Sequence, residues 1–292
     1  MRNLIYILQK LTCIGGGYMP DFQSFNAGWT RSTPVPVAFH LHDWYEIYLF
    51  IGGDVEYFVE KDKYRLRYGD ILVFNSMEVH KPTFFSDAPY ERSCIHFAPE
   101  ALRRYGCADM DLLSCFEQRP HGSGNLIRMQ GKQQEEFVAA VRQLCDAERN
   151  KAVGADTERL ALMLRVMVLL NRAFVKQNRA ERKVHKGGAV YRVLDYIDAN
   201  LDQQFDLDDI ASACFLSKGY LCRAFKQYTG STIHRYILNK RVSRAKQLLL
   251  DGHNVTETCA MSGFNDYSNF IRSFSGVTGV SPGVYQKSNL NG

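Results

Sequence analysis

Residues 255–285 read VTETCAMSGFNDYSNFIRSFSGVTGVSPGVY. Two short helical patterns flank a turn at Gly263–Phe264, and the second pattern ends in a glycine. The same arrangement occurs earlier in the chain, over Leu207–Gly230, once a single residue is inserted in the second copy. Agreement at core, turn and exposed basic positions together indicates a repeated structural unit. We therefore expect two helix–turn–helix units in tandem, a motif whose second helix enters the major groove of duplex DNA.

In the first copy, Asp206 is expected to cap the first helix, and Ser217 is expected to cap the second, reading helix. Leu221 and Phe225 are four residues apart and are expected to face the core. The remaining positions form an outer face that is a candidate for DNA contact, namely Ser217, Lys218, Gly219, Cys222, Arg223 and Lys226.

In the second copy, Asn265 is expected to cap the reading helix, and Asp266 is an equal candidate for that role. The candidates for DNA contact in this copy are Asn265, Asp266, Tyr267, Asn269 and Arg272. Arginine binds guanine with two hydrogen bonds, whereas lysine more often contacts phosphate.

The helix between the copies carries the pattern RxxxAxxLL, and the second copy contains GFxDxSxFxRxF and then GxSPxxY. In these motifs the C-terminal third of the chain resembles the AraC/XylS family of bacterial transcription regulators. The resemblance implies binding to two successive major grooves of double-stranded DNA, RNA polymerase as a partner, and a cupin-like sensor domain. The matching residues are Arg241, Ala245, Leu248, Leu249, Gly263, Phe264, Asp266, Ser268, Phe270, Arg272, Phe274, Gly279, Ser281, Pro282 and Tyr285.

The second copy departs from the family pattern at several positions. Thr258 and Ser262 stand where apolar residues are usual, and Ser275-Gly276 replaces a common pair of lysines. Each phosphate contact that is lost lowers the salt dependence of binding by about 0.9 in log–log slope. We therefore expect the first copy to supply more of the DNA affinity than the second.

Short aromatic and β-branched runs, separated by turn residues, extend from Gly28 to Phe97. This spacing predicts an antiparallel sandwich or barrel. If residues 40–48 form one extended strand, then His40, His42, Glu46 and Tyr48 share a face, because side chains alternate along a strand.

The spacing of these residues, with Gly53, Gly69 and His80, resembles the two motifs of the cupin barrel, although Asn75 and Met77 depart from the second motif. In metal-binding cupins the matching His40, His42, Glu46 and His80 hold a divalent metal, and such ligands suit Fe, Mn, Ni or Zn. Three interpretations remain open: a metal site, a pocket for a polar effector, or a structural network. The candidates for effector binding are His40, His42, Glu46, Tyr48, Tyr57 and His80, whereas His96 is expected to be an ordinary strand residue.

Two amphipathic helices are predicted over Lys132–Arg149 and Asp156–Val175, followed by a basic linker at 177–188. The second helix is apolar nearly all round, so it needs partners on more than one side. Packing on its own barrel and dimerisation are the alternatives, and we expect a homodimer. The predicted domains are a cupin-like β-barrel at 1–125, a helical dimerisation and linker region at 126–185, and an all-α DNA-binding domain at 186–292.

The chain has 292 residues, a net charge of +5 and eight cysteines. The cysteines form no CxxC pair, which favours a reducing cytoplasm without disulfides. The apolar run at Leu4–Leu8 is too short for a signal peptide and predicts a strand, and no segment predicts a membrane span. The leading interpretation is a ligand-responsive regulator that is not an enzyme. The alternatives are a metal-dependent cupin enzyme fused to a DNA-binding domain, and a regulator without an effector that is controlled by abundance or a partner.

Overall fold

The computed structural model describes residues 25–119, 122–180 and 188–290. The chain divides into two compact units. Among the described residues, the N-terminal unit contains 25–37 and 43–180 without 120–121, and the C-terminal unit contains 38–42 and 188–290. No helix within these described ranges is long and apolar enough to cross a membrane. The strand predicted at Leu4–Leu8 lies outside the described residues.

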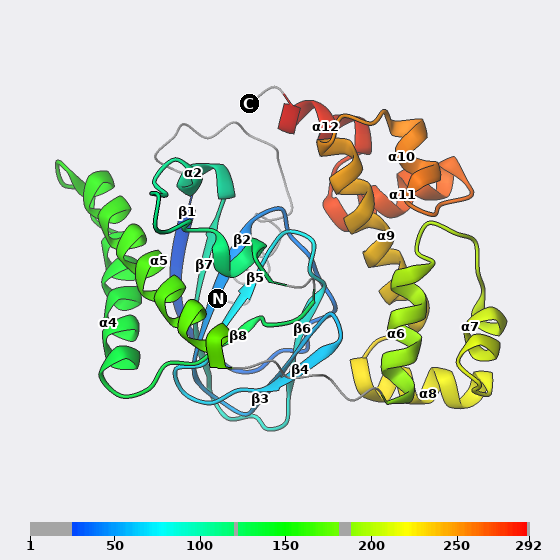
Figure 1. Ribbon diagram of the computed structural model, residues 1–292, viewed down its shortest axis with the longest axis horizontal. Helices are drawn as coiled ribbons and strands as arrows, with labels where there is room; N and C mark the ends of the chain where they lie inside the picture. Colours follow the sequence, from blue (N-terminus) through cyan, green and yellow to red (C-terminus); the bar gives the residue numbers. More distant parts are fainter. Residues whose placement is uncertain (1–24, 120–121, 181–187, 291–292) are drawn as a thin grey trace. The chain divides into compact units, whose positions relative to one another are not determined.

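Two antiparallel sheets form the centre of the N-terminal unit (Figure 1). The larger sheet has the order β1 (Phe25–Ser32), β7 (Tyr90–Phe97), β2 (Tyr45–Gly52), β5 (Ile71–Phe74) and β8 (Leu126–Ile127). The smaller sheet has the order β4 (Asp62–Arg65), β3 (Val55–Val59) and β6 (His80–Phe84). Tyr48 and Leu72 of the larger sheet share one buried core with Tyr57 of the smaller sheet. The predicted barrel is therefore two facing sheets, a cupin-like jelly roll in which the pairing of the described strands does not close a ring.

The opposite face of the larger sheet is covered by helices of the same unit. These helices are α2 (Pro99–Arg103), α3 (Ser114–Glu117), α4 (Lys132–Ala147) and α5 (Ala155–Ala180). Ile47, Ile95 and Val73 alternate with the inner residues and pack with Val141 of α4 and Val166 of α5 in a second core. Strand alternation therefore builds both cores, and α5 buries much of its apolar surface within its own unit.

A buried ion pair holds the connection after α3 against the sheet. Arg119 and Glu78 are both almost fully buried and form a two-pronged salt bridge. Arg119 also donates to the backbone oxygens of Cys115 and Ser123, at 3.0 and 3.1 Å. Burial alone would raise the pKa of Glu78, but Arg119 holds it below its ordinary value. The pair therefore fixes the segment that leads from α3 to β8.

The C-terminal unit is all helical. It consists of α6 (Ala189–Ala199), α7 (Leu207–Ala213), α8 (Lys218–Thr229), α9 (Ile233–Leu250), α10 (Val255–Met261), α11 (Tyr267–Thr278) and α12 (Pro282–Leu290). The pairs α7–α8 and α10–α11 are the predicted helix–turn–helix units, and α9 connects them (Figure 1). The connection between α10 and α11 is the longer one, which confirms the predicted insertion. Asp206 and Asn254 cap α7 and α10 in matching capping boxes.

Candidate nucleic-acid interface and effector site

α8, the reading helix of the first helix–turn–helix unit, buries an apolar face and exposes a polar face, as the sequence predicts. Ser217 caps it by accepting a hydrogen bond from the Tyr220 amide. Leu221 and Phe225 are buried, at 1% and 0% exposure, and fix the helix on the core. The outer face exposes Lys218, Gly219, Cys222, Arg223 and Lys226.

Lys218 already has an acidic neighbour. Its ammonium forms an ion pair with Asp208 in the first turn of α7, and this hydrogen bond raises the pKa of Lys218. Both side chains are more than half exposed, so the ion pair is weak and can exchange for a phosphate. Arg223 and Lys226 are therefore the more available cations of α8.

The reading helix of the second unit, α11, carries less positive charge. Asp266 caps this helix through the amide of Asn269, so the prediction of Asn265 as the cap is wrong. Because one residue is inserted in this copy, α11 begins one position later. Tyr267 and Arg272 are exposed, and Asn269 accepts hydrogen bonds from Arg272 and Ser273 at 3.5 and 3.3 Å. Arg272 is the only basic residue of α11.

Arg241 connects the two helix–turn–helix units from the middle of α9. Its guanidinium donates to the backbone oxygens of Leu201 and Gln203, at 3.2 and 2.8 Å. Gln204, in the same segment, donates to the oxygen of Gly263 in the turn of the second unit at 3.0 Å. The family motif identified Arg241, and the structure shows that it fixes the connection before α7 near the second turn.

A carboxylate and two imidazoles meet between the sheets of the N-terminal unit. Glu46 is 4% exposed, and its Oε2 lies 3.6 Å from Nε2 of both His80 and His96. Strand pairing places Glu46 opposite His96. Burial alone would lower the pKa of His96, but the Glu46 carboxylate raises it. The expectation that His96 is an ordinary strand residue is therefore wrong, because the register between β2 and β7 cannot be read from either strand alone.

Aromatic and hydroxyl groups continue this cluster. The hydroxyls of Tyr48 and Tyr90 are 2.7 Å apart. Tyr57 lies beside Tyr48, and Phe74 stacks on His80 with ring centroids 4.1 Å apart. Tyr48, Tyr57 and His80 thus gather in one interior, as predicted. Sequence reasoning missed Tyr90, Arg92 and Cys94, although strict alternation along β7 places them on the same face as His96.

His40 and His42 do not belong to the strand that carries Glu46. β2 begins at Tyr45, after a bend at Asp43–Trp44, so the predicted extended run over residues 40–48 is wrong. The bend interrupts the alternation on which the shared face depended. Ala38–His42 is part of the C-terminal unit. The strands themselves therefore supply Glu46 and His80 of the predicted metal set, and they add His96.

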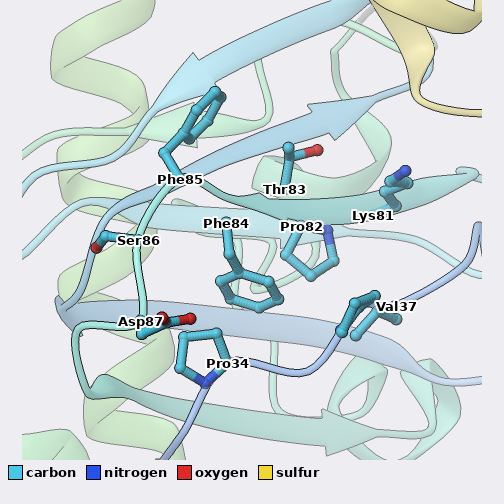
Figure 2. Close-up of a pocket in the computed structure, with 10 residues that line it drawn as sticks. Pro34, Val37, Lys81, Pro82, Thr83, Phe84, Phe85, Ser86 and Asp87 are labelled. Carbon is cyan, nitrogen blue, oxygen red and sulfur yellow. The ribbon is translucent and has the colours of Figure 1, made fainter.

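A cavity of about 490 Å³ opens beside β6. Its walls come from an extended segment after β1, which contributes Pro34, Pro36 and Val37, and from residues 81–87. Figure 2 shows Pro82 and Phe84 on the side of Pro34 and Val37, while Lys81 and Thr83 extend from the other side of the strand. Phe84 also contacts Tyr90, with ring centroids 4.9 Å apart. The cavity is of the size of small-molecule sites and borders the inner aromatic cluster.

Two family models match the chain. Residues 35–167 match an AraC-like ligand binding domain, and residues 210–288 match a helix-turn-helix domain. The chain is 27% identical over 263 residues to the HTH-type transcriptional regulator YdeC of Bacillus subtilis, covering 87% of both chains. It is 24% identical over 267 residues to the melibiose operon regulatory protein of Escherichia coli, covering 88% of this chain and 86% of that protein.

A higher identity extends over a shorter stretch of the chain. The chain is 34% identical over 99 residues to the transposon Tn10 TetD protein of Escherichia coli, covering 34% of this chain and 72% of that protein. The two domain matches fall one in each compact unit, and the YdeC and melibiose matches extend over most of the chain. The chain therefore belongs to the AraC family of transcription regulators, with a ligand-binding domain followed by a helix–turn–helix domain.

Proposed function

We propose that the protein regulates transcription by placing α8 and α11 in two successive major grooves of duplex DNA. The observation that carries this proposal is a pair of capped, outward-facing helices with buried inner faces, joined by the single helix α9. Cations on the outer faces meet phosphates or guanine edges. The proposed contacts are Ser217, Lys218, Gly219, Cys222, Arg223 and Lys226 of the first unit and Asn265, Asp266, Tyr267, Asn269 and Arg272 of the second.

The two reading helices contribute unequally in this proposal. α8 presents Lys218, Arg223 and Lys226, whereas α11 presents Arg272. The double variant Arg223→Ala/Lys226→Ala is expected to weaken binding more than Arg272→Ala. It is also expected to lower the slope of log K against log salt by about 0.9 for each phosphate contact removed.

Genome-wide mapping of bound DNA identifies the binding sites, and a recovered fragment serves as the probe for fluorescence anisotropy with the full chain. The double variant Arg149→Ala/Lys151→Ala removes the same charge from exposed positions of the N-terminal unit and is the matched control. Equal losses for Arg272→Ala and the α8 double variant would contradict the unequal contribution. Failure to recover discrete genomic sites would contradict the proposed function.

The N-terminal unit is proposed to bind a small-molecule effector among Glu46, Tyr48, Tyr57 and His80. His40 and His42 remain candidates for effector binding on the basis of the sequence. Such a ligand changes DNA occupancy only if it binds one state of the protein more tightly than the other. Thermal-shift measurements with sugars and small acids, on wild type and Glu46→Gln, test this binding. Metal analysis of the purified protein distinguishes a resident divalent metal, and stoichiometric metal would replace the effector assignment for Glu46 and His80.

RNA polymerase is the proposed partner at the promoter, and the proposed location is therefore the cytoplasm.

A homodimer is the proposed assembly. The α5 helix leaves Leu164 and Val168 only partly buried and Val175 43% exposed. These residues lie along one stripe of the helix and are available to a second copy. Light scattering of wild type and Val168→Lys tests this contact, and an unchanged dimer in the variant would contradict it.

A further inference from the structure

An arginine, Arg92, lies on the inner face of β7. Tyr90, Arg92, Cys94 and His96 alternate with Ser93 and Ile95, which face the helices. The Arg92 guanidinium carbon lies 4.4 Å from the centre of the Tyr90 ring. Within the described ranges of the chain, no Asp or Glu forms an ion pair with Arg92.

The neighbouring groups do not compensate the charge of Arg92. Burial raises the pKa of Tyr48, Tyr57, Tyr90 and Cys94 well above neutrality, so these groups are uncharged at pH 7. Glu46 forms ion pairs with His80 and His96. Arg92 is partly buried, and a partly desolvated cation without an opposite charge beside it favours a bound anion.

Glu91 does not serve as that anion either. It neighbours Arg92 in sequence, but alternation places it on the other face of β7. There it accepts a hydrogen bond from Trp29 at 2.8 Å and approaches Arg31 at 3.9 Å. On the inner face, no carboxylate of the described residues therefore pairs with the Arg92 guanidinium.

The edge strand β1 leaves the surface beside β7 open. β1 pairs with β7 so that Gly28 lies opposite Cys94 and Thr30 opposite Arg92. A Cβ placed on Gly28 would meet no atom within 4 Å, and Thr30 is exposed. Tyr90, which carries the guanidinium on its ring, also contacts Phe84 in the wall of the 490 Å³ cavity. The Tyr90 ring thus contacts both Arg92 and one wall residue of the cavity.

We propose that the effector is a small carboxylate, whose carboxyl group binds Arg92 and whose body packs against Tyr90 and Phe84 in the cavity beside β6. This inference rests on the proposed effector function and gives the effector a chemical class. A guanidinium binds a carboxylate with two parallel hydrogen bonds, which provides both the affinity and the orientation. A neutral molecule of the same shape leaves the charge of Arg92 unpaired and binds more weakly.

The experiment uses the full chain and pairs of compounds that differ in charge: benzoate with benzamide, 4-hydroxybenzoate with 4-hydroxybenzamide, and galacturonate with galactose. Thermal shift, followed by calorimetric titration, measures binding. At least one acid is expected to bind about tenfold or more tightly than its neutral counterpart. Arg92→Gln is expected to abolish that difference, and Arg92→Lys to retain part of it. Arg31→Gln removes an exposed arginine from the neighbouring strand and is the matched control that keeps the preference.

Three results would overturn the carboxylate assignment: no acid binds at 10 mM, the neutral compounds bind wild type as tightly as the acids, or Arg92→Gln retains the preference. If Arg92→Gln does not fold, Arg92→Lys alone tests the assignment. This variant keeps the charge and loses the two-pronged geometry, so it is expected to retain only part of the preference for acids. DNA binding by the wild type is measured separately. If the wild type binds specific DNA but shows no preference for acids, only the effector class is rejected. If the wild type does not bind specific DNA, the proposed function itself is rejected.

Discussion

The turn of the second helix–turn–helix unit has no room for a side chain at Gly263. Its φ is +85°, in the left-handed region. A Cβ there would lie 2.1 Å from the Leu201 oxygen and 2.8 Å from Nε of Arg241. That oxygen accepts the Arg241 hydrogen bond at 3.2 Å. The substitution Gly263→Ala therefore forces the backbone apart and breaks the hydrogen bond between α9 and the connection before α7.

The expected loss of stability has two parts. The left-handed conformation costs a residue with a Cβ about 1–2 kcal/mol. Loss of a hydrogen bond from a charged donor costs about 1.5–3 kcal/mol. Together they predict that the unfolding free energy of the C-terminal unit falls by about 2.5–5 kcal/mol. For a domain of this size the unfolding midpoint should drop by at least about 10 °C.

The assay distinguishes unfolding of the N-terminal unit from unfolding of the C-terminal unit, because both tryptophans, Trp29 and Trp44, lie in the N-terminal unit. Thermal unfolding is followed by tryptophan fluorescence and by far-ultraviolet circular dichroism on the same sample. Gly263→Ala should lower the circular dichroism transition and leave the fluorescence transition unchanged.

Gly276 in α11 is the control for this substitution. No atom lies within 4 Å of a Cβ at that position, so Gly276→Ala should stabilise the helix by about 0.5–1 kcal/mol. If Gly263→Ala unfolds within about 0.5 kcal/mol of wild type, the close approach to Leu201 does not exist and the reasoning is refuted.

Three further substitutions test the cores and the ion pairs. Arg119→Met should destabilise the N-terminal unit by about 3–5 kcal/mol, because it leaves Glu78 buried and charged. Urea unfolding measures this loss, which should shrink as the pH falls through the folded pKa of Glu78. Thr258→Val should stabilise the C-terminal unit by about 1 kcal/mol, since the buried Thr258 hydroxyl has no hydrogen-bond partner among the described residues. A lower calorimetric midpoint for this variant would contradict that. The raised pKa of His96 stabilises the fold below pH about 6.5, and this stability is lost as the pH rises through the folded pKa. The pH dependence of unfolding should therefore weaken in Glu46→Gln.

Features that depend on neighbours in the chain were predictable. The caps at Asp206 and Ser217 and the buried pair Leu221 and Phe225 all lie where the sequence predicts. Capping and helical periodicity involve residues only a few positions apart, so a single sequence contains the whole signal. The error at Asn265 has the same origin, since Asn265 and Asp266 are both good caps and the sequence does not decide between them.

The inner face of the N-terminal unit was predictable only in part. Glu46, Tyr48, Tyr57 and His80 could be chosen by residue type and spacing. The ion pair of Glu46 with His96 and the surroundings of Arg92 depend on the register between β2 and β7. These strands are distant in sequence, and their relative position is set by packing on both faces of the sheet.

The turns of the two helix–turn–helix units show most directly what is predictable from the sequence and what is not. The sequence alone determined that Phe215 and Gly263 occupy equivalent turn positions, and both have positive φ. Only the tertiary structure decided what each position tolerates. Phe215 is 93% exposed, so its side chain extends into solvent, whereas Leu201 and Arg241 fill the space beside Gly263. A repeated pattern specifies backbone conformation locally, but the room for a side chain depends on what packs against it from distant parts of the chain.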